Sequence, residues 1–125
     1  MTLHEVMLAG RNKLRQAGVP NPETDIQWIV CAITHFNRVQ LAINKEQVLS
    51  PAQVENIKEW VARRCTREPL QYILGNQSFM NIKVLTDKRA LIPRPETEIL
   101  AERAINLIRK DYPRFEKFEL LDLCT

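Results

Sequence analysis

The sequence is poor in glycine, cysteine and aromatic residues, and it has no long apolar run. It contains 3 Gly among 125 residues, which excludes collagen-like and Gly-rich disordered chains. No uninterrupted apolar stretch approaches the roughly 20 residues of a membrane-spanning helix. The first residues, Met1 to Glu5, lack the basic start and apolar centre of a signal peptide. With 45% hydrophobic and 26% charged residues, the composition predicts a globular protein without a membrane span, in the cytoplasm or an organelle.

The three cysteines and two histidines give no sign of a metal site. Cys31, Cys65 and Cys124 are odd in number and contain no Cys-x-x-Cys pair, so free thiols are expected instead of disulfides or zinc. His4 and His35 are isolated and fit no Ser/His/Asp or metal-ligand pattern. The net charge of +3 is spread along the chain, and no direct nucleic-acid contact is expected from it.

Two helices are predicted near the N-terminus. Thr2 and Glu5 have the spacing of a capping box, in which each side chain binds the other's free backbone N–H. That helix should cover about residues 2–17, with its apolar side chains on one face. Asn21-Pro22 places a capping Asn before a Pro at the first helical position, and therefore predicts the start of a second helix.

Further helices follow and predict a bundle. Residues 38–43 form a short candidate helix. The run Ser50-Pro51-Ala52-Gln53 combines a capping serine, a first-turn proline and a capping-box glutamine, and predicts a helix that continues until Pro69 intervenes. Because each helix has one apolar stripe to bury, residues 1–68 are expected to pack as a helical bundle.

After Pro69 the helical pattern of apolar residues gives way to signals for strands and turns. Aromatic and β-branched residues around a central Asn predict a short hairpin over residues 78–85. Pro93 and Pro95 forbid a helix through Arg94 and predict an extended turn before a helix. The apolar face of that helix should be buried.

A nearly continuous apolar run covers residues 118–124. Such a run is typical of a strand in a parallel sheet with both faces covered. The sequence offers no parallel neighbour, so we expect the strand to need a further domain or a sheet borrowed from a partner chain, for example in a strand-mediated dimer. The predicted fold class is mainly α, with a helical bundle, a β-hairpin linker and the first helix and strand of an α/β domain.

Two groups of residues are candidates for binding, and each has a structural alternative. Arg63, Arg64 and Arg67 lie at a helix end, where cations favourably meet free carbonyls. That structural role is the favoured interpretation, and the alternative is a contact patch for an acidic or RNA-bearing partner. A buried strand that ends at Asp122 is how nucleotide-type cofactor sites begin in open α/β sheets. Residues 91–98 are either a rigid connector or a functional segment in which two prolines fix the backbone position of Arg94 just before a helix.

Three segments of the second half carry a family resemblance. Residues 67–75 read Arg-Glu-Pro-Leu-Gln-Tyr-Ile-Leu-Gly, residues 91–98 read Leu-Ile-Pro-Arg-Pro-Glu-Thr-Glu, and residues 121–125 read Leu-Asp-Leu-Cys-Thr. In order and spacing they resemble the HemK/PrmC family of release-factor glutamine methyltransferases. The Pro-Arg-Pro-Glu-Thr-Glu run separates this family from similar enzymes for a ribosomal-protein glutamine, which usually carry Pro-Arg-Ser. Residues 1–66 match only as a helical domain of suitable size.

The resemblance implies a two-domain enzyme. Residues 1–68 would be a substrate-recognition domain, residues 69–90 a β-hairpin linker, and residues 91–125 the start of a Rossmann-like S-adenosylmethionine domain. Such enzymes methylate the amide nitrogen of the Gly-Gly-Gln glutamine in class 1 peptide release factors. An amide nitrogen is a poor nucleophile, so the reaction depends on an electrophilic sulfonium methyl and accurate placement. The family's Asn-Pro-Pro-Tyr loop does not occur in this sequence, so no catalytic residue and no activity are expected of the chain alone.

The resemblance also implies roles for individual residues. The start of the family's cofactor loop, usually Asp-Leu-Gly-Thr, is matched by Asp122, Cys124 and Thr125, and a Cys in place of Gly suggests that this position needs no positive φ. The segment that borders the cofactor pocket is matched by Arg94, Glu96 and Thr97, where an arginine or a helix-start N–H could face the methionine carboxylate. Apart from the motifs, we hypothesise that the exposed face of the bundle, including Arg63, Arg64 and Arg67, docks the release factor. The alternative function is a non-enzymatic helical adaptor for a protein or RNA of the translation machinery.

Overall fold

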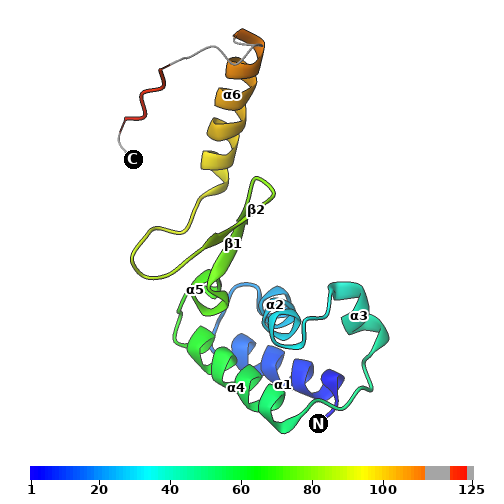
Figure 1. Ribbon diagram of the computed structural model, residues 1–125. Coiled ribbons are helices and arrows are strands. Elements are labelled where there is room, and N and C mark those ends of the chain that lie inside the picture. The colour runs from blue at the N-terminus through cyan, green and yellow to red at the C-terminus, as the bar shows by residue number, and fades with distance from the viewer. Residues whose placement is uncertain (112–118, 124–125) are drawn as a thin grey trace. The chain divides into compact units, whose positions relative to one another are not determined.

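The computed structural model describes residues 1–111 and 119–123 (Figure 1). The chain divides into two compact units, one of residues 1–77 with 84–92 and the other of residues 78–83 with 93–125. Both units draw on the β-hairpin, because the division falls within its two strands. None of the described helices combines the length and apolar character that a bilayer crossing requires.

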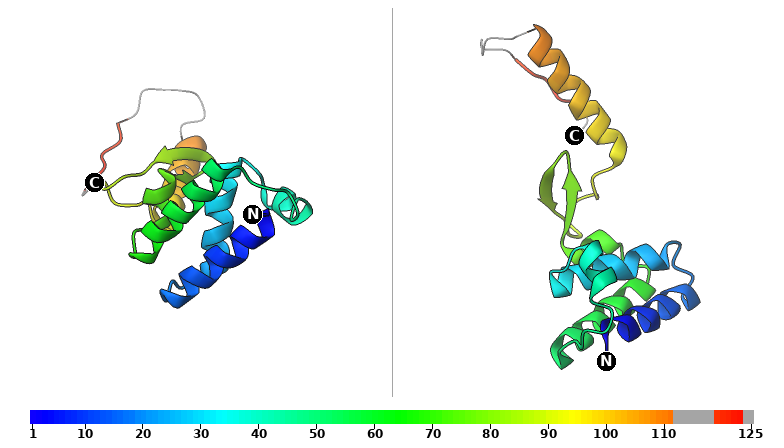
Figure 2. Two further views of the ribbon diagram at one scale, coloured as in Figure 1. Left: turned by 90° about the horizontal axis from the view of Figure 1, so that it is seen from below. Right: turned by 90° about the vertical axis from the view of Figure 1, so that its right-hand side faces the viewer.

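The first unit is a helical bundle built on three long helices. These are α1 (Leu3–Gln16), α2 (Pro22–Thr34) and α4 (Pro51–Cys65). Each packs against the other two, and the views in Figure 2 show them side by side. The short helix α3 (Arg38–Ile43) contacts α2, while α5 (Leu70–Leu74) contacts α2 and α4. The predicted bundle is therefore confirmed.

Reciprocal side-chain caps start α1 and α4 where the sequence predicted them. Glu5 Oε2 accepts from the Thr2 N–H at 2.7 Å, and Thr2 Oγ1 accepts from the Glu5 N–H at 3.2 Å. The first of these bonds is the main reason why the pKa of Glu5 is lowered. Ser50 and Gln53 form the same box at α4, with bonds of 3.0 and 3.2 Å. These caps satisfy backbone donors that the first helical turn leaves free.

The caps of the other two bundle helices differ from the prediction. Asn21 makes no side-chain cap bond at the start of α2, so the predicted capping role is wrong. Its backbone, at φ −127° and ψ 62°, is outside the extended conformation that an N-cap normally takes. Helix α3 has an unpredicted capping box, in which Asn37 and Gln40 exchange two bonds of 2.8 Å. The two bonds of this box stabilise the first turn of a helix that has only six residues.

The core lies between α1, α2 and α4. Gly10 sits where these helices meet, and a Cβ there would lie 3.1 Å from Ile26 Cγ1 and 3.4 Å from Val61 Cγ2. The absence of a side chain at this position therefore permits the close packing. All three helices contribute fully buried apolar side chains, among them Leu3, Leu14, Ile26, Ile29, Val30, Ile57 and Val61.

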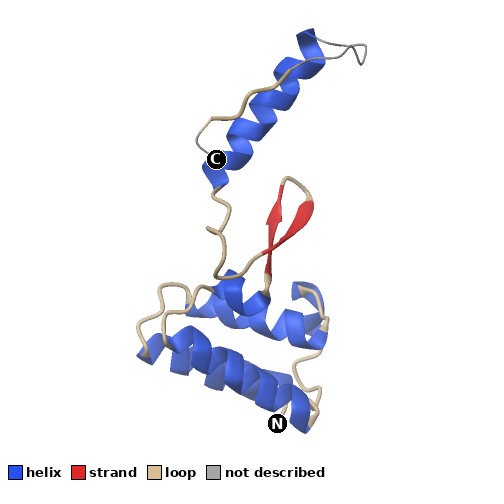
Figure 3. Ribbon diagram, turned by 60° about the vertical axis from the view of Figure 1, so that its left-hand side comes forward, coloured by secondary structure: helices blue, strands red, loops and turns tan. Residues whose placement is uncertain are grey.

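The hairpin is confirmed, and a helix precedes it that the sequence did not predict. Strands β1 (Asn76–Phe79) and β2 (Ile82–Leu85), drawn red in Figure 3, pair in a two-stranded antiparallel sheet. Met80 and Asn81 join them with φ of 46° and 66°, the two-residue turn whose twist suits paired strands. Helix α5 was missed because five residues are too few for a periodic pattern. It ends at Gly75, which is left-handed with φ of 73°.

The second unit contains α6 (Pro95–Asp111), which begins at the second proline as predicted. Its expected apolar face is not buried, and Leu100 and Leu107 are exposed. Residues 119–123 form no strand and are all exposed. The predicted strand over 118–124 is thus not found in its described part, while residues 118 and 124 lie outside the described residues. A strand needs a neighbour to bond its backbone, and the hairpin is the only sheet in the described ranges.

Candidate functional site

Arg64 joins the end of α4 to the start of α2. Its Nε donates to Asp25 Oδ2 at 2.7 Å, and its Nη1 donates to the Glu68 carbonyl at 2.9 Å. The two side chains keep only 16% and 10% of their exposure. In such an environment each charge depends on its partner, because the loss of one would leave the other poorly solvated. Arg64 is therefore engaged within the bundle.

Arg63 is engaged at the same end of α4. Its Nε and Nη2 donate to the two carboxylate oxygens of Glu68 at 2.9 and 2.7 Å. This two-pronged geometry is the strong form of an arginine–carboxylate pair. The bond from Arg63 lowers the pKa of Glu68, and Glu68 in turn raises the pKa of Arg63. The pair fixes the turn between α4 and α5.

Arg67 differs from the other two arginines of the predicted cluster. It has a positive φ of 71°, an uncommon conformation for a side-chain-bearing residue. Its Nη2 lies 3.1 Å from where a Cβ on Gly18 would be. Within the described ranges no carboxylate forms an ion pair with it. Of the three predicted docking residues, Arg67 is the one whose charge is bonded to no carboxylate in the part of the chain that the structure describes.

Sequence reasoning missed Asp25, the buried partner of Arg64. A signal was present, because Asp25 lies in the same stripe of α2 as Pro22, Ile26 and Ile29, all of which are buried. A carboxylate in an apolar stripe is expensive to bury unless a cation reaches it. That spacing could have predicted a buried ion pair, although it could not have named its partner.

The chain that follows the hairpin is fastened to α5. The Thr86 hydroxyl donates to the Gln71 carbonyl at 2.7 Å, and the Thr86 N–H donates to the Gly75 carbonyl at 3.0 Å. The Tyr72 hydroxyl donates to the Ala90 carbonyl at 3.0 Å. Residues 86–90 are therefore held against α5 by side-chain and backbone bonds.

Within this segment the Asp87 carboxylate forms an ion pair with Arg89 that can be tested by titration. Arg89 donates to it from Nε, Nη2 and the backbone N–H, the shortest bond being 2.6 Å, and these bonds lower the pKa of Asp87 to about 2. Arg89→Gln is expected to raise this pKa toward the ordinary value of about 3.9. A carbon-detected NMR titration of the Asp87 side chain measures it.

The sign of the accompanying pH effect follows from the direction of the shift. A lowered folded-state pKa favours folding at neutral pH, and that contribution is lost as the pH falls from the ordinary carboxyl range through about 2. Lys88→Gln is the matched control and should leave the Asp87 titration unchanged. An unchanged pKa in Arg89→Gln would contradict the assigned cause.

The Pro-Arg-Pro-Glu segment starts α6 through local bonds. Arg94 Nε lies 3.4 Å from Glu96 Oε2, with both side chains 70% exposed. The Thr97 N–H donates to the Arg94 carbonyl at 3.0 Å. The pKa of Glu96 is lowered mainly by its own backbone N–H and then by Arg94. Glu98, in the first turn of α6, accepts from the Met80 N–H of the hairpin turn at 3.1 Å.

The remaining predicted site residues lie at the end of the chain. Asp122 is exposed and outside regular structure, while Cys124 and Thr125 lie outside the described residues. The gathering of these residues with Arg94, Glu96 and Thr97 stays a prediction. In the described ranges no group of three or more His, Cys, Asp or Glu side chains could hold a metal ion.

Comparison with known proteins identifies the family of the helical part. The family model for the PrmC N-terminal domain matches residues 5–75, so the chain belongs to the PrmC N-terminal domain family. A release factor glutamine methyltransferase of Geobacter sulfurreducens is 36% identical over 104 residues, which are 83% of this chain and 37% of the relative. One of Deinococcus radiodurans is 31% identical over 125 residues, which are 100% of this chain and 44% of the relative.

A third relative extends the comparison. The release factor glutamine methyltransferase of Thermodesulfovibrio yellowstonii is 39% identical over 101 residues, 81% of this chain and 35% of the relative. The chain thus spans between 35% and 44% of the length of these three relatives. The family match falls on the helical residues, which sequence reasoning could relate to the family only by size.

Proposed function

We propose that the chain is the N-terminal portion of an S-adenosylmethionine-dependent protein-(glutamine-N5) methyltransferase. The substrate would be the Gly-Gly-Gln glutamine of a class 1 peptide release factor. The observation that carries the proposal is the family match over residues 5–75, together with relatives named release factor glutamine methyltransferase that align over as much as the whole chain. Residues 1–68 would recognise the substrate, residues 69–90 would link, and residues 91–125 would begin the cofactor domain.

The arrangement around α6 supports a cofactor role for Arg94. Its contact with Glu96 is long and exposed, and such pairs contribute little stability. Arg94 could therefore exchange Glu96 for the carboxylate of the methionine moiety at small cost. Glu96, Thr97, Asp122, Cys124 and Thr125 complete the proposed cofactor set. Because the sequence contains no Asn-Pro-Pro-Tyr motif, the chain alone should transfer no methyl group and bind the cofactor weakly.

Release-factor docking is proposed for Arg63, Arg64 and Arg67, with different roles. Arg67 would contact the partner directly, because its charge is not bonded to a carboxylate in the described ranges. Arg63 keeps 37% of its side-chain exposure while bonded to Glu68, so it could contribute at the edge. Arg64 would act by holding the end of α4 in place.

Methyl transfer by the complete gene product tests the proposed function. The enzyme is incubated with a class 1 release factor and methyl-labelled S-adenosylmethionine, and the modified residue is located by mass spectrometry. We expect one methyl group on the Gly-Gly-Gln glutamine. No label should enter a release factor in which that glutamine is replaced by alanine, nor should the 125-residue chain alone transfer any. Failure of the complete enzyme to label the glutamine would overturn the proposal.

Charge reversal tests the docking role. Arg67→Glu in the complete enzyme is expected to weaken release-factor binding about tenfold, because opposite charges across an interface would become like charges. The dissociation constant is measured by calorimetry. Lys58→Glu on α4 is the control, since Lys58 is an exposed cation outside the cluster. Equal affinity for Arg67→Glu and Lys58→Glu would remove Arg67 from the interface.

A further inference from the structure

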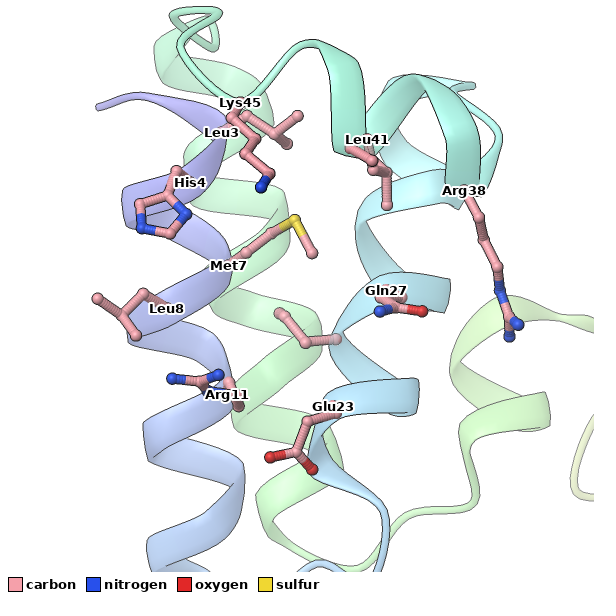
Figure 4. Close-up of a pocket in the computed structure, with 12 residues that line it drawn as sticks. Leu3, His4, Met7, Leu8, Arg11, Glu23, Gln27, Arg38, Leu41 and Lys45 are labelled. Carbon is pink, nitrogen blue, oxygen red and sulfur yellow. The ribbon is translucent and has the colours of Figure 1, made fainter.

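A groove of about 290 Å³ opens between α1, α2 and α3 (Figure 4). Its walls are largely apolar, with Met7 from α1, Ile26 from α2 and Leu41 from α3. These three side chains are aliphatic or thioether groups that take up a bulky apolar side chain without needing hydrogen bonds. The groove lies entirely within the first unit.

Cations lie at both ends of this groove. Figure 4 shows the Lys45 side chain reaching in from the α3 end, while Arg11 of α1 lies at the opposite end near Glu23. In the described part of the chain neither Lys45 nor Arg11 forms an ion pair. Glu23 also lines the groove, and its pKa is lowered mainly by its own backbone N–H and in part by Arg11, but the side-chain hydrogen bond of Glu23 goes to Arg15. With Arg11, Arg38 and Lys45 against the one carboxylate of Glu23, the lining carries an excess of positive charge.

The Arg11 side chain also has a buried N–H donor without a hydrogen-bond acceptor among the described residues. Its Nε is shielded from solvent and has no hydrogen-bond partner in the described residues. A buried donor without an acceptor carries a desolvation penalty. A small rotation of the guanidinium toward a ligand carboxylate would relieve that penalty. Among the described residues no carboxylate accepts a hydrogen bond from this nitrogen.

The groove is held in shape by bonds within the bundle. The Lys45 carbonyl accepts from the His4 N–H at 3.0 Å, so the end of α3 is tied to the start of α1. Arg38 is fixed by stacking on Trp28, with its guanidinium carbon 4.9 Å from the ring centre. A preformed groove of this kind loses little conformational freedom when a ligand enters.

We propose that this groove binds a short segment of a partner protein in which a carboxylate side chain lies next to a bulky apolar one. The apolar side chain would pack between Met7, Ile26 and Leu41, and the carboxylate would meet Lys45 or Arg11. A single-stranded RNA fits less well, because bases bind by stacking on aromatic faces and the groove walls are aliphatic. The proposal goes beyond methyl transfer and shares no residue with the Arg63, Arg64 and Arg67 cluster.

Selection of peptides on the 125-residue chain tests this proposal. A phage-displayed library of random short peptides is panned on the immobilised chain, and the best binder is synthesised with a fluorescein label. We expect recovered peptides to carry Asp or Glu beside Leu, Ile, Met or Phe. Replacement of the peptide's acidic residue by its amide should weaken binding about tenfold in fluorescence anisotropy. Binding should shift the NMR signals of Met7, Ile26 and Leu41.

Variants of the chain locate the binding. Lys45→Gln and Arg11→Gln should each weaken binding of the selected peptide about tenfold, whereas the matched control Lys58→Gln on α4 should not. Lys45 is exposed, so its replacement should leave the circular dichroism spectrum unchanged. Three results would overturn the proposal: no recovered binder, binders without acidic residues, or equal binding by Lys45→Gln and the parent chain. Displacement of the peptide by a single-stranded RNA oligonucleotide, with loss of RNA binding in Lys45→Gln, would assign the groove to RNA instead.

Discussion

Replacing Arg64 with methionine is expected to destabilise the bundle by about 3 kcal/mol, because Asp25 would keep a charge that is mostly removed from water. Methionine preserves much of the arginine stem, so the loss reports on the ion pair more than on packing. The Asp25 side chain is only 10% exposed in the folded protein. Urea unfolding of the 125-residue chain, followed by circular dichroism, measures the change in the free energy of unfolding.

Two companion variants show whether burial is the cause. Arg15→Met removes an exposed pair with Glu23, whose side chains are 60% and 51% exposed, and should leave the free energy of unfolding nearly unchanged. The double variant Asp25→Leu with Arg64→Met removes both charges and should recover much of the loss. If Arg64→Met were no more destabilising than Arg15→Met, the Asp25 pair would not be a stabilising element.

Gly10→Val is expected to destabilise the bundle by at least about 2 kcal/mol. Any Cβ at this position meets Ile26, and the branched atoms of valine would also meet Val61, which is 2% exposed. Overpacking of this kind typically costs about 1–3 kcal/mol. The better helix propensity of valine over glycine offsets only a few tenths of a kcal/mol. Thermal and urea unfolding of the 125-residue chain give the magnitude.

A compensating change at Ile26 identifies the collision. Gly10→Ala should be milder than Gly10→Val, and adding Ile26→Val should restore part of its stability because the terminal Cδ1 of Ile26 is removed. Ala9→Val is the control for valine in the same helix, since Ala9 is exposed. Its effect should stay below about 1 kcal/mol. Additive effects of Gly10→Ala and Ile26→Val would show that the two positions do not compete for space.

Local signals in the sequence predicted most helices of the bundle, whereas contacts between residues far apart in the sequence could not be predicted. The capping boxes at Thr2 and Ser50 are set by residues three apart, and both are confirmed. The bond between Arg64 and Asp25 spans 39 positions, so no spacing rule could pair them. The absent cap at Asn21 shows the converse limit, because the right residue type does nothing when its backbone conformation is wrong.

The sequence predicted which segments contribute to the candidate site, but it did not predict which residues of those segments contact one another. The proline-flanked Arg94 does precede a helix, because proline restrains the backbone wherever it occurs. Residues 119–123 include three leucines but form no strand, because strand formation depends on a neighbour that a local apolar pattern cannot supply. The bond made by Glu98 could not be predicted because its partner is the backbone N–H of Met80, and every residue except proline carries such a donor.

The bonds made by Thr86 and Tyr72 bear on how the protein can be dissected and lengthened. Since Thr86 returns to Gly75 and to Gln71, residues 76–85 leave the bundle and come back to the same place. Shortening or lengthening the hairpin would then leave the position of Ala90 against α5 unchanged. A fragment cut after residue 68 would lose this return, whereas one cut after residue 92 would keep it. A change in hairpin length would therefore leave residues 86–90 bonded to α5, but it would displace the turn whose Met80 N–H donates to Glu98 of α6.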